Sequence, residues 1–186
     1  LEQPSVSIDN YAAAAETVRY LIAQGHRRVA LLSAGNDFIS TQLRRQGYED
    51  VLRQAGLYCG DELVAYADAD YSYNSGLTAA DALLRLQPRP TAICCVSDIL
   101  ALSVISRAHD LGLRVPEDLS VTGIDDVDYT TMFHPQLTTV AQPCYEMGQE
   151  SLRILLRMLR GGQPPRTRTF LPYKLVLRES VAAHNE

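Results

Sequence analysis

Short apolar runs alternate with longer amphipathic segments along the chain. The runs at 28–34, 63–66, 91–96, 119–124, 138–141 and 170–177 have the length of buried strands. Periodic apolar positions predict helices from residue 9 or 10 to Gly25, from Ser40 to Gly56, and over about 73–86, 98–111 and 143–159. Strands that alternate with helices in this way predict an α/β fold, in which helices cover both faces of a parallel sheet.

Polar and aromatic residues follow most of the predicted strands. They are Asn36, Asp37 and Arg44 after the first strand, Asp68, Asp70, Tyr71 and Tyr73 after the second, Ser97 and Asp98 after the third, Asp125, Asp126 and Asp128 after the fourth, and Gln142 after the fifth. In open parallel sheets, ligands bind at the carboxyl ends of the strands. Carboxylates, an arginine, hydroxyls and aromatic rings suit the hydroxyl groups and ring of a sugar or a nucleoside.

Each of these residues also has a purely structural interpretation. Asp98 could cap the helix that follows it, and Asp125 or Asp126 could be ordinary turn residues. Arg44 could be a solvated arginine on a helix surface. Asp68 and Asp70 could ligate calcium, but the glycine and the distal glutamate of a calcium loop are missing.

Composition excludes some functions and leaves others open. The 186 residues carry a net charge of −5 and are 46% hydrophobic, which is enough for a substantial core but does not favour nucleic-acid binding by this part of the protein. The densest basic cluster is His26-Arg27-Arg28. No apolar run has the length of a membrane span or a secretory signal, so we expect a cytoplasmic protein with no membrane contact.

Cofactor and metal chemistry find little support in the sequence. Neither phosphate-binding glycine pattern, GxGxxG or GxxxxGK[ST], occurs, and no cofactor is expected. The four cysteines, Cys59, Cys94, Cys95 and Cys144, lack metal-ligand spacing. Neighbouring strand residues point to opposite faces, so Cys94 and Cys95 cannot share a metal ion. We expect reduced cysteines in the core and no metal site.

Catalysis also lacks a recognisable setting. None of the four histidines lies beside a serine or cysteine in a strand-to-helix turn, so no nucleophile and no catalytic residue is assigned. A pair of carboxylates of the glycosidase type remains open, because their separation is a three-dimensional quantity. We therefore expect a binding protein and not an enzyme.

Motifs in order along the chain carry a resemblance to a known family. They include the stretches at 4–10, 20–28, 44–48, 96–98, 112–120, 123–126 and 135–140, such as Gly123-Ile124-Asp125-Asp126 and Pro135-Gln136-Leu137-Thr138-Thr139. The chain resembles the effector-binding domain of LacI/GalR-family bacterial repressors over nearly its whole length. The stretches at 116–120 and 141–148 are most similar to the cytidine-responsive branch.

The resemblance implies a type I periplasmic-binding-protein-like fold of two lobes joined by three crossovers, with the first lobe largely missing. Residues 1–9 would form the first crossover and 10–141 the second lobe. Residues 142–169 would form a crossover and a helix of the missing first lobe, and 170–186 a returning strand and tail. Without its lobe, we expect that helix to be displaced, swapped into a neighbouring molecule or poorly ordered.

Site residues carried over from the family are ligand contacts and dimer contacts. Arg44 would clamp the ligand, Asp125 would accept its hydroxyls from the opposite side, and Tyr71 would cover its ring. Ser97 stands where relatives often have asparagine, Gln142 at a lobe crossover and Asp9 at the first crossover. Leu102, Met132 and Phe133 are candidate dimer contacts, although Leu102 could equally be a core residue.

The function implied is that of a ligand sensor in a DNA-binding regulator. A nucleoside or sugar effector would change lobe orientation and operator affinity in a homodimer, and DNA would be bound only through a helix-turn-helix outside this chain. A transport-associated sugar- or nucleoside-binding protein of the same fold is the alternative, and a processing enzyme is a third class.

Overall fold

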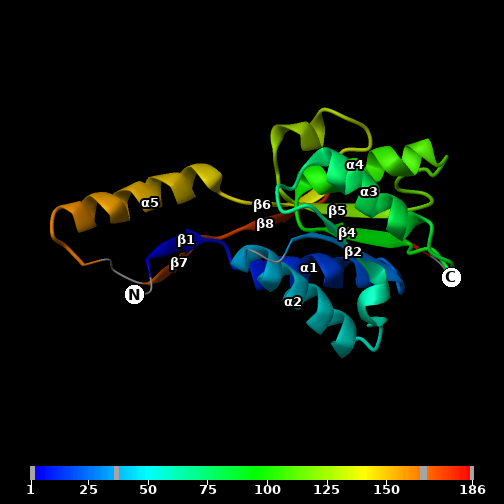
Figure 1. The fold of residues 1–186 in the computed structure, drawn as a ribbon, viewed down its shortest axis with the longest axis horizontal. Helices are drawn as coiled ribbons and strands as arrows, with labels where there is room; N and C mark the ends of the chain where they lie inside the picture. The colour runs from blue at the N-terminus through cyan, green and yellow to red at the C-terminus, as the bar shows by residue number, and fades with distance from the viewer. Residues whose placement is uncertain (1–2, 36–37, 164–166, 185–186) are drawn as a thin grey trace.

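The structure, a computed structural model, describes residues 3–35, 38–163 and 167–184. It consists of one lobe built on a central sheet and an extension that projects from one end of that sheet (Figure 1). Asn36 and Asp37, two of the polar residues expected at the strand ends, lie outside the described residues.

Six strands form the sheet of the lobe in the order β3-β2-β4-β5-β6-β8. They are β2 (Val29–Ala34), β3 (Val64–Ala67), β4 (Ala92–Cys95), β5 (Ser120–Asp125), β6 (Thr138–Ala141) and β8 (Lys174–Val176). The first five are paired in parallel, and β8 is antiparallel to β6 at the edge. The predicted parallel sheet is confirmed apart from β8. Because the other five strands run in the same direction, their carboxyl ends lie along the same edge of the sheet, which is called the carboxyl edge.

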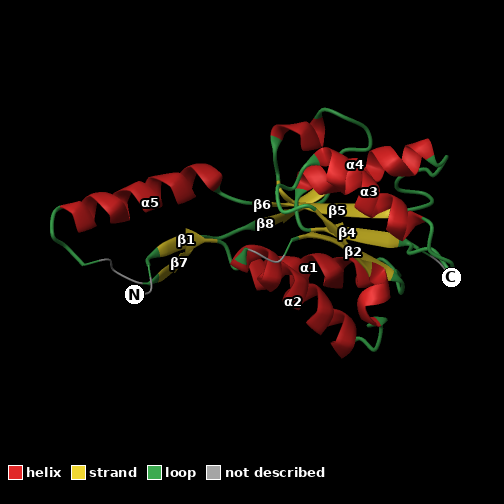
Figure 2. Ribbon diagram, in the orientation of Figure 1, coloured by secondary structure: helices red, strands yellow, loops and turns green. Residues whose placement is uncertain are grey.

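Helices cover both faces of the sheet, as the sequence predicts. Helices α1 (Asn10–Ala23) and α2 (Ile39–Gln54) lie on one face, and α3 (Tyr73–Leu84) and α4 (Asp98–Asp110) on the other (Figure 2). A Cβ at Gly47 would lie 2.4 Å from the carbonyl oxygen of Tyr11, so only glycine lets α1 and α2 approach this closely. Two short 3-10 turns, η1 (Gly60–Leu63) and η2 (Asp128–Thr131), complete the loops.

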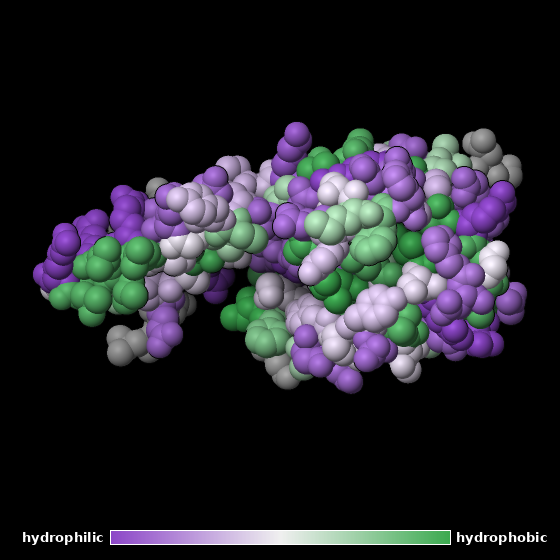
Figure 3. Space-filling view, turned by 90° about the horizontal axis from the view of Figure 1, so that it is seen from above, coloured by the Kyte–Doolittle hydropathy of each residue, from purple (hydrophilic) through white to green (hydrophobic). Residues whose placement is uncertain are grey.

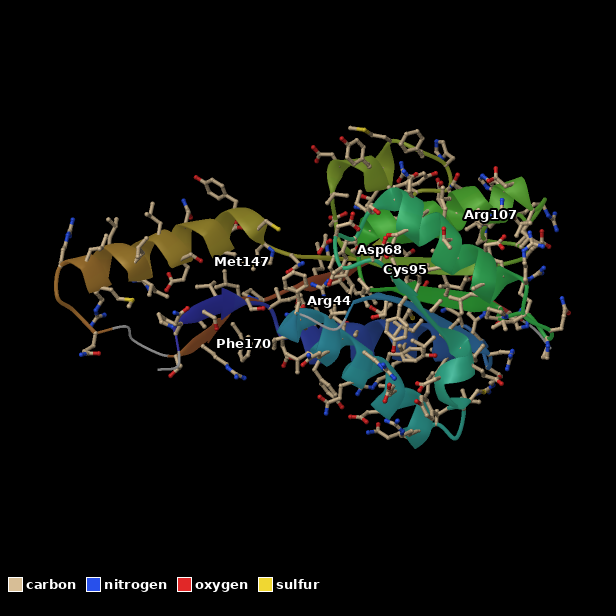
Figure 4. All side chains as sticks on the ribbon, viewed as in Figure 1. Arg44, Asp68, Cys95, Arg107, Met147 and Phe170 are labelled. Atoms are coloured by element: carbon tan, nitrogen blue, oxygen red, sulfur yellow. The ribbon has the colours of Figure 1, made fainter. Side chains whose placement is uncertain are left out.

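The cysteines divide into a buried and an exposed pair. Cys94 and Cys95 lie on β4 in the core, and Figure 4 shows Cys95 inside the lobe. Burial raises the pKa of the Cys94 thiol to about 12. Cys59 and Cys144 are exposed. The expectation of four core cysteines is therefore wrong for two of them, because their flanking segments lack the continuous apolar run that surrounds Cys94.

The extension is built from three elements distant in sequence. Strands β1 (Ser5–Ser7) and β7 (Arg168–Phe170) pair in parallel, and α5 (Cys144–Leu159) packs on β1. The single strand predicted over 170–177 is wrong: β7 belongs to the extension and β8 to the lobe. Pro172 lies between them and has no backbone N–H for a strand ladder.

Helix α5 turns much of its apolar face to the outside. Among its apolar residues Ile154 is buried, whereas Leu152, Leu155, Leu156, Met158 and Leu159 are exposed. Apolar surface on the extension is visible in the space-filling view (Figure 3). An amphipathic helix ordinarily buries such a face against another element. No helix in the described ranges has the length and apolar character needed to cross a membrane.

Candidate functional site

Backbone strain gathers at the carboxyl ends of the parallel strands. Of the described non-glycine residues, those with positive φ are Tyr71 at 55°, Asp125 at 135° and Asp126 at 59°. Tyr71 follows β3, and the two aspartates end and follow β5. Each such conformation costs about 1–3 kcal/mol and tends to persist where function requires it. All three therefore mark this edge of the lobe as the candidate site.

Arg44 is the buried cation of this edge. It comes from α2, is only 7% exposed, and lies on the side of the lobe that faces the extension (Figure 4). Its Nε donates to Asn10 Oδ1 at 2.8 Å and its Nη1 to the Val96 carbonyl at 2.5 Å. Burial lowers its pKa, and the nearby Asp125 carboxylate partly opposes that shift. The interpretation of Arg44 as a solvated surface arginine is wrong.

Asp125 stands opposite Arg44 across the strand ends. Its Oδ1 is 3.9 Å from Arg44 Nη2 and accepts a 2.5 Å hydrogen bond from Gln142 Nε2. Burial raises the pKa of Asp125, and the positive charge of Arg44 lowers it again in part. Its side chain is 29% exposed, so it retains acceptor capacity for a ligand. The structure thus brings three of the predicted site residues together: Arg44, Asp125 and Gln142.

Aromatic rings border this polar pair. The hydroxyl of Tyr71 is hydrogen-bonded to Thr41 on α2, and the Phe38 ring centroid lies 6.2 Å from the Tyr71 ring. Phe38 is half exposed, and Ile39 next to it is 66% exposed. These side chains provide an apolar surface on which a flat ring can rest.

Ser97, and not Asp98, caps the helix α4. Ser97 is the cap of α4, because its Oγ accepts from the Leu100 amide at 3.4 Å. Asp98 is the first helical residue, and its fully buried carboxylate bonds outside the helix, to Thr139 and to the Val127 amide. The interpretation of Asp98 as the helix cap is therefore wrong, while Ser97 is buried beside the site.

Asp9 has a different part in the structure. Its carboxylate caps α1 by accepting from the Ala12 amide at 2.9 Å. The neighbouring Asn10, where the sequence predicts only the start of a helix, is buried and accepts from Arg44. Asp70 accepts from the Ser72 amide, and Asp68 is exposed. Asn10, Thr41 and Phe38 are site residues that the sequence did not predict: Thr41 and Phe38 lie in none of the motifs, and the stretch 4–10 gives Asn10 no role in binding.

The candidate dimer contacts lie in two places: Leu102 on α4, and Met132 and Phe133 in the loop after η2. Met132 is 62% and Phe133 61% exposed after η2, whereas Leu102 is half-buried on α4. Arg178 anchors this loop through a 2.6 Å ion pair with Asp126 and a bond to Thr130. Two exposed apolar residues on a well-anchored loop are suited to contact another surface.

A hollow of about 500 Å³ lies at the opposite, amino-terminal end of the sheet and is lined by His26, Thr91, Asp118 and His184 among others. The polar groups described above do not line it. We place the candidate site at the carboxyl ends, where strain, a buried cation and an accessible carboxylate coincide. Within the described ranges, no cluster of His, Cys, Asp and Glu is suited to hold a metal ion.

Comparison with known proteins gives consistent matches. A family model described as periplasmic binding protein-like domain matches residues 18–181. HTH-type transcriptional repressor CytR from Escherichia coli (strain K12) is 38% identical over 98% of this chain and 53% of its own length. Catabolite control protein A from Priestia megaterium is 36% identical over 96% of this chain and 53% of its own. The chain thus spans about half the length of these relatives.

Solved structures match equally well. A putative transcriptional regulator LacI from Bacillus cereus subsp. cytotoxis has a TM-score of 0.92 at 31% identity and matches 98% of this chain and 64% of its own. A transcriptional regulator CelR–cellobiose complex has a TM-score of 0.88 at 36% identity and matches 96% of this chain and 54% of its own. All these named matches are transcription regulators and not enzymes, in agreement with the sequence prediction.

Proposed function

The chain belongs to the periplasmic binding protein-like family, in the branch found in LacI-family regulators, and we propose that it senses a nucleoside or sugar effector for a bacterial DNA-binding transcriptional regulator. The observation that carries this proposal is the pairing of buried Arg44 with partly exposed Asp125 on a strained edge. A polar ligand with several hydroxyls would complete their hydrogen bonding.

The chemistry of the edge defines what the ligand must offer. Arg44 Nη2 and the Asp125 carboxylate present a donor and an acceptor side by side, which matches a hydroxyl or a carbonyl next to a hydroxyl. Tyr71 and Phe38 would cover the ring. Ser97 supplies one short hydroxyl, already bonded to the Leu100 amide, where an asparagine would present a separate NH2 group and carbonyl, so it would select a different hydrogen-bond pattern. Gln142 would hold Asp125 in place.

The same proposal assigns each segment of the chain to a lobe or to a crossover between lobes. Residues 10–141 form the second lobe, 1–9 and 142–169 carry the first crossover and the helix of a first lobe, and 170–186 return to the second lobe. The exposed apolar face of α5 supports this, because a first lobe would bury it. That lobe would supply the other wall of the effector cleft, and a helix-turn-helix outside this chain would bind DNA.

Regulation would follow from differential affinity. An effector that binds one lobe arrangement more tightly shifts the population toward it, and so changes operator affinity. The intact regulator would act as a cytoplasmic homodimer. Met132 and Phe133 are exposed as dimer contacts require, whereas half-buried Leu102 contributes less.

Calorimetric titration of the full-length protein with a panel of nucleosides and sugars tests the proposal. Arg44→Ala should weaken binding about 10- to 100-fold, because it removes charge-assisted hydrogen bonds of about 1.5–3 kcal/mol. Arg45→Ala is the matched control: Arg45 adjoins Arg44 on α2 but pairs with Glu49 and Asp61.

Three outcomes are informative. Binding that Arg44→Ala weakens and Arg45→Ala leaves unchanged supports the site. No heat from any member of the panel contradicts the ligand class. Tight binding by a full-length protein that has no DNA-binding segment would indicate a transport-associated binding protein instead.

A further inference from the structure

Asp98 is a buried carboxylate that the proposed ligand site does not use directly. It is 0% exposed at the start of α4, directly after Ser97. A ligand at the strand ends therefore cannot touch it. Keeping an ionisable group in such a place is costly unless its hydrogen bonds are satisfied, so its partners indicate its role.

The partners of Asp98 belong to the loop that carries Asp125. Its Oδ2 accepts from the Val127 amide at 3.0 Å, and its Oδ1 accepts from Thr139 Oγ1 on β6 at 2.5 Å. The Asp126 amide also lowers the pKa of the Asp98 carboxyl, and the Asp98 amide that of Asp125. The side chain of the first residue of α4 is thus bonded to the loop after β5 and to β6.

Gly123 on β5 lies against the Asp98 carboxylate. A Cβ at Gly123 would lie 2.3 Å from Asp98 Oδ1 and 2.9 Å from Leu137 Cδ2. Glycine on β5 therefore makes room for the carboxylate between the strand and the helix. Gly123 stands two residues before Asp125, so one strand both admits Asp98 and presents the ligand-facing carboxylate.

The loop needs outside support because two successive non-glycine residues have positive φ, Asp125 and Asp126. Such strain persists only where the surroundings over-determine the conformation. Gln142 holds the side chain of Asp125 and Arg178 that of Asp126. Asp98 is the group that holds the backbone itself, at the Val127 amide directly after the two strained residues.

From these contacts we infer that Asp98 is a positioning residue, whose buried carboxylate fixes the strained loop 125–127 so that Asp125 faces the effector. The inference rests on the proposed function for the part that concerns the effector. Loss of the Asp98 charge would release the loop amides and let Asp125 turn away from Arg44, without removing any atom that touches the ligand.

The charge of Asp98 depends on pH. Burial raises its pKa to about 6, the bonds from Thr139, Val127 and Asp126 lower it, and the negative charge of Asp125 raises it. Arg44 from α2, Asp125 from β5 and Cys95 from β4 are the ionisable groups that face it. Below about pH 6 the Asp98 carboxyl is largely protonated. It is then neutral, and it can no longer accept charge-assisted hydrogen bonds at both of its oxygens.

The test uses the full-length protein and the nucleoside and sugar panel, with three variants. Asp98→Asn should weaken binding of the panel member that binds the wild type about 10- to 100-fold at pH 7.5. It should also abolish the loss of affinity that the wild type shows below pH 6. Asp118→Asn, which removes a carboxylate bonded to Arg114 in a loop at the other end of the lobe, should change neither.

Thr139→Val keeps the inference testable if Asp98→Asn fails to fold. It removes a hydrogen bond that favours the charged form, so the affinity midpoint should move to higher pH. Amide hydrogen exchange without ligand supplies an independent readout: exchange over 125–128 should accelerate in Asp98→Asn and not in Asp118→Asn.

The outcomes separate the two proposals. If no panel member binds the wild type, the proposed ligand class fails, while amide exchange still decides whether Asp98 holds the loop. Unchanged exchange in Asp98→Asn overturns the inference. The inference is also overturned if Asp98→Asn binds the ligand with the same affinity and the same pH dependence as the wild type. An unchanged pH midpoint of affinity in Thr139→Val would overturn it as well.

Discussion

The two ends of the same sheet are held in different ways. At the carboxyl ends lie three non-glycine residues with positive φ, a buried arginine and two carboxylates of raised pKa. At the amino ends the segment 180–184 runs across the starts of the strands, and its groups are bonded to the lobe. The Ser180 N–H donates to the Gln136 carbonyl, and the Ser180 carbonyl accepts from the Val121 amide on β5. The His184 amide donates to the Gln24 carbonyl at 2.7 Å.

This difference separates binding from stability. Backbone strain and buried charge collect where the effector is proposed to bind, whereas the opposite end is held by hydrogen bonds to the segment 180–184. A substitution at the amino end should therefore cost stability and leave binding intact. A substitution of Arg44, whose charge faces Asp125, should mainly weaken binding.

Ser180→Ala should have the largest effect on stability. The Ser180 hydroxyl is fully buried, donates to the Val121 carbonyl at 2.6 Å and accepts from the Thr138 amide at 2.9 Å. Alanine leaves a buried N–H without a partner, so the free energy of unfolding should fall by about 2–3 kcal/mol. Urea unfolding measures the loss.

The control for this change is Ser151→Ala on α5. Its hydroxyl also bonds a backbone carbonyl, that of Met147 at 2.7 Å, but the residue is exposed. Its loss should stay below about 0.5 kcal/mol. If Ser180→Ala costs no more than Ser151→Ala, or if it weakens effector binding as strongly as Arg44→Ala does, the amino end is not a purely structural region.

Opposite pH dependence at the two ends is the second prediction. At the amino end, burial lowers the pKa of His26 to about 4, and the nearby His184 lowers it further. The unfolded chain then binds more protons than the folded one between pH 4 and 6.5, so stability falls as pH falls through this window. At the carboxyl end, the pKa of Asp98 is raised to about 6, so ionised Asp98 opposes folding, and stability from this group rises as pH falls toward 4.

Single substitutions separate the two contributions. Relative to the wild type, His26→Gln should flatten the loss of stability on acidification, and Asp98→Asn should steepen it. Each effect should be on the order of 2 kcal/mol between pH 7 and pH 4.5. Thermal unfolding followed at several pH values measures both. Changes of the same sign in the two variants would contradict the assignment of the two ends.

The sequence predicts most of the lobe because its signals are local. Apolar runs bounded by glycine or proline identify β2, β4, β5 and β6 to within one or two residues. It fails where a partner is distant. The short β1 pairs with β7 more than 160 residues away, which no periodicity reveals. Division of 170–177 between two sheets likewise depends on where the chain crosses from the extension to the lobe.

The candidate site shows the same limit. Residues directly after apolar runs, such as Asp125 and Tyr71, can be expected at the strand ends from the sequence. Asn10 and Thr41 cannot, because they reach the edge from helix positions that only tertiary packing brings near Arg44 and Tyr71. Asp98 looks like a helix cap in the sequence, since its bonds to Thr139 and Val127 require β5 and β6 to be in place.

The smallest expected effect is the difference in stability between Asp125→Gly and Asp125→Ala. It is also the most direct test of backbone strain. Both remove the carboxylate and its contacts with Arg44 and Gln142, so both should abolish the contribution of Asp125 to effector binding. They differ in the backbone: glycine adopts a φ of 135° without a clash and alanine does not. Asp125→Gly should therefore be more stable than Asp125→Ala by about 1 kcal/mol, after allowance for the greater entropy of glycine in the unfolded chain. Urea unfolding of the two variants isolates this term. Equal stability, or a more stable alanine variant, would mean that the carboxyl end stores no strain at Asp125, and the contrast between the two ends would then rest on charge alone.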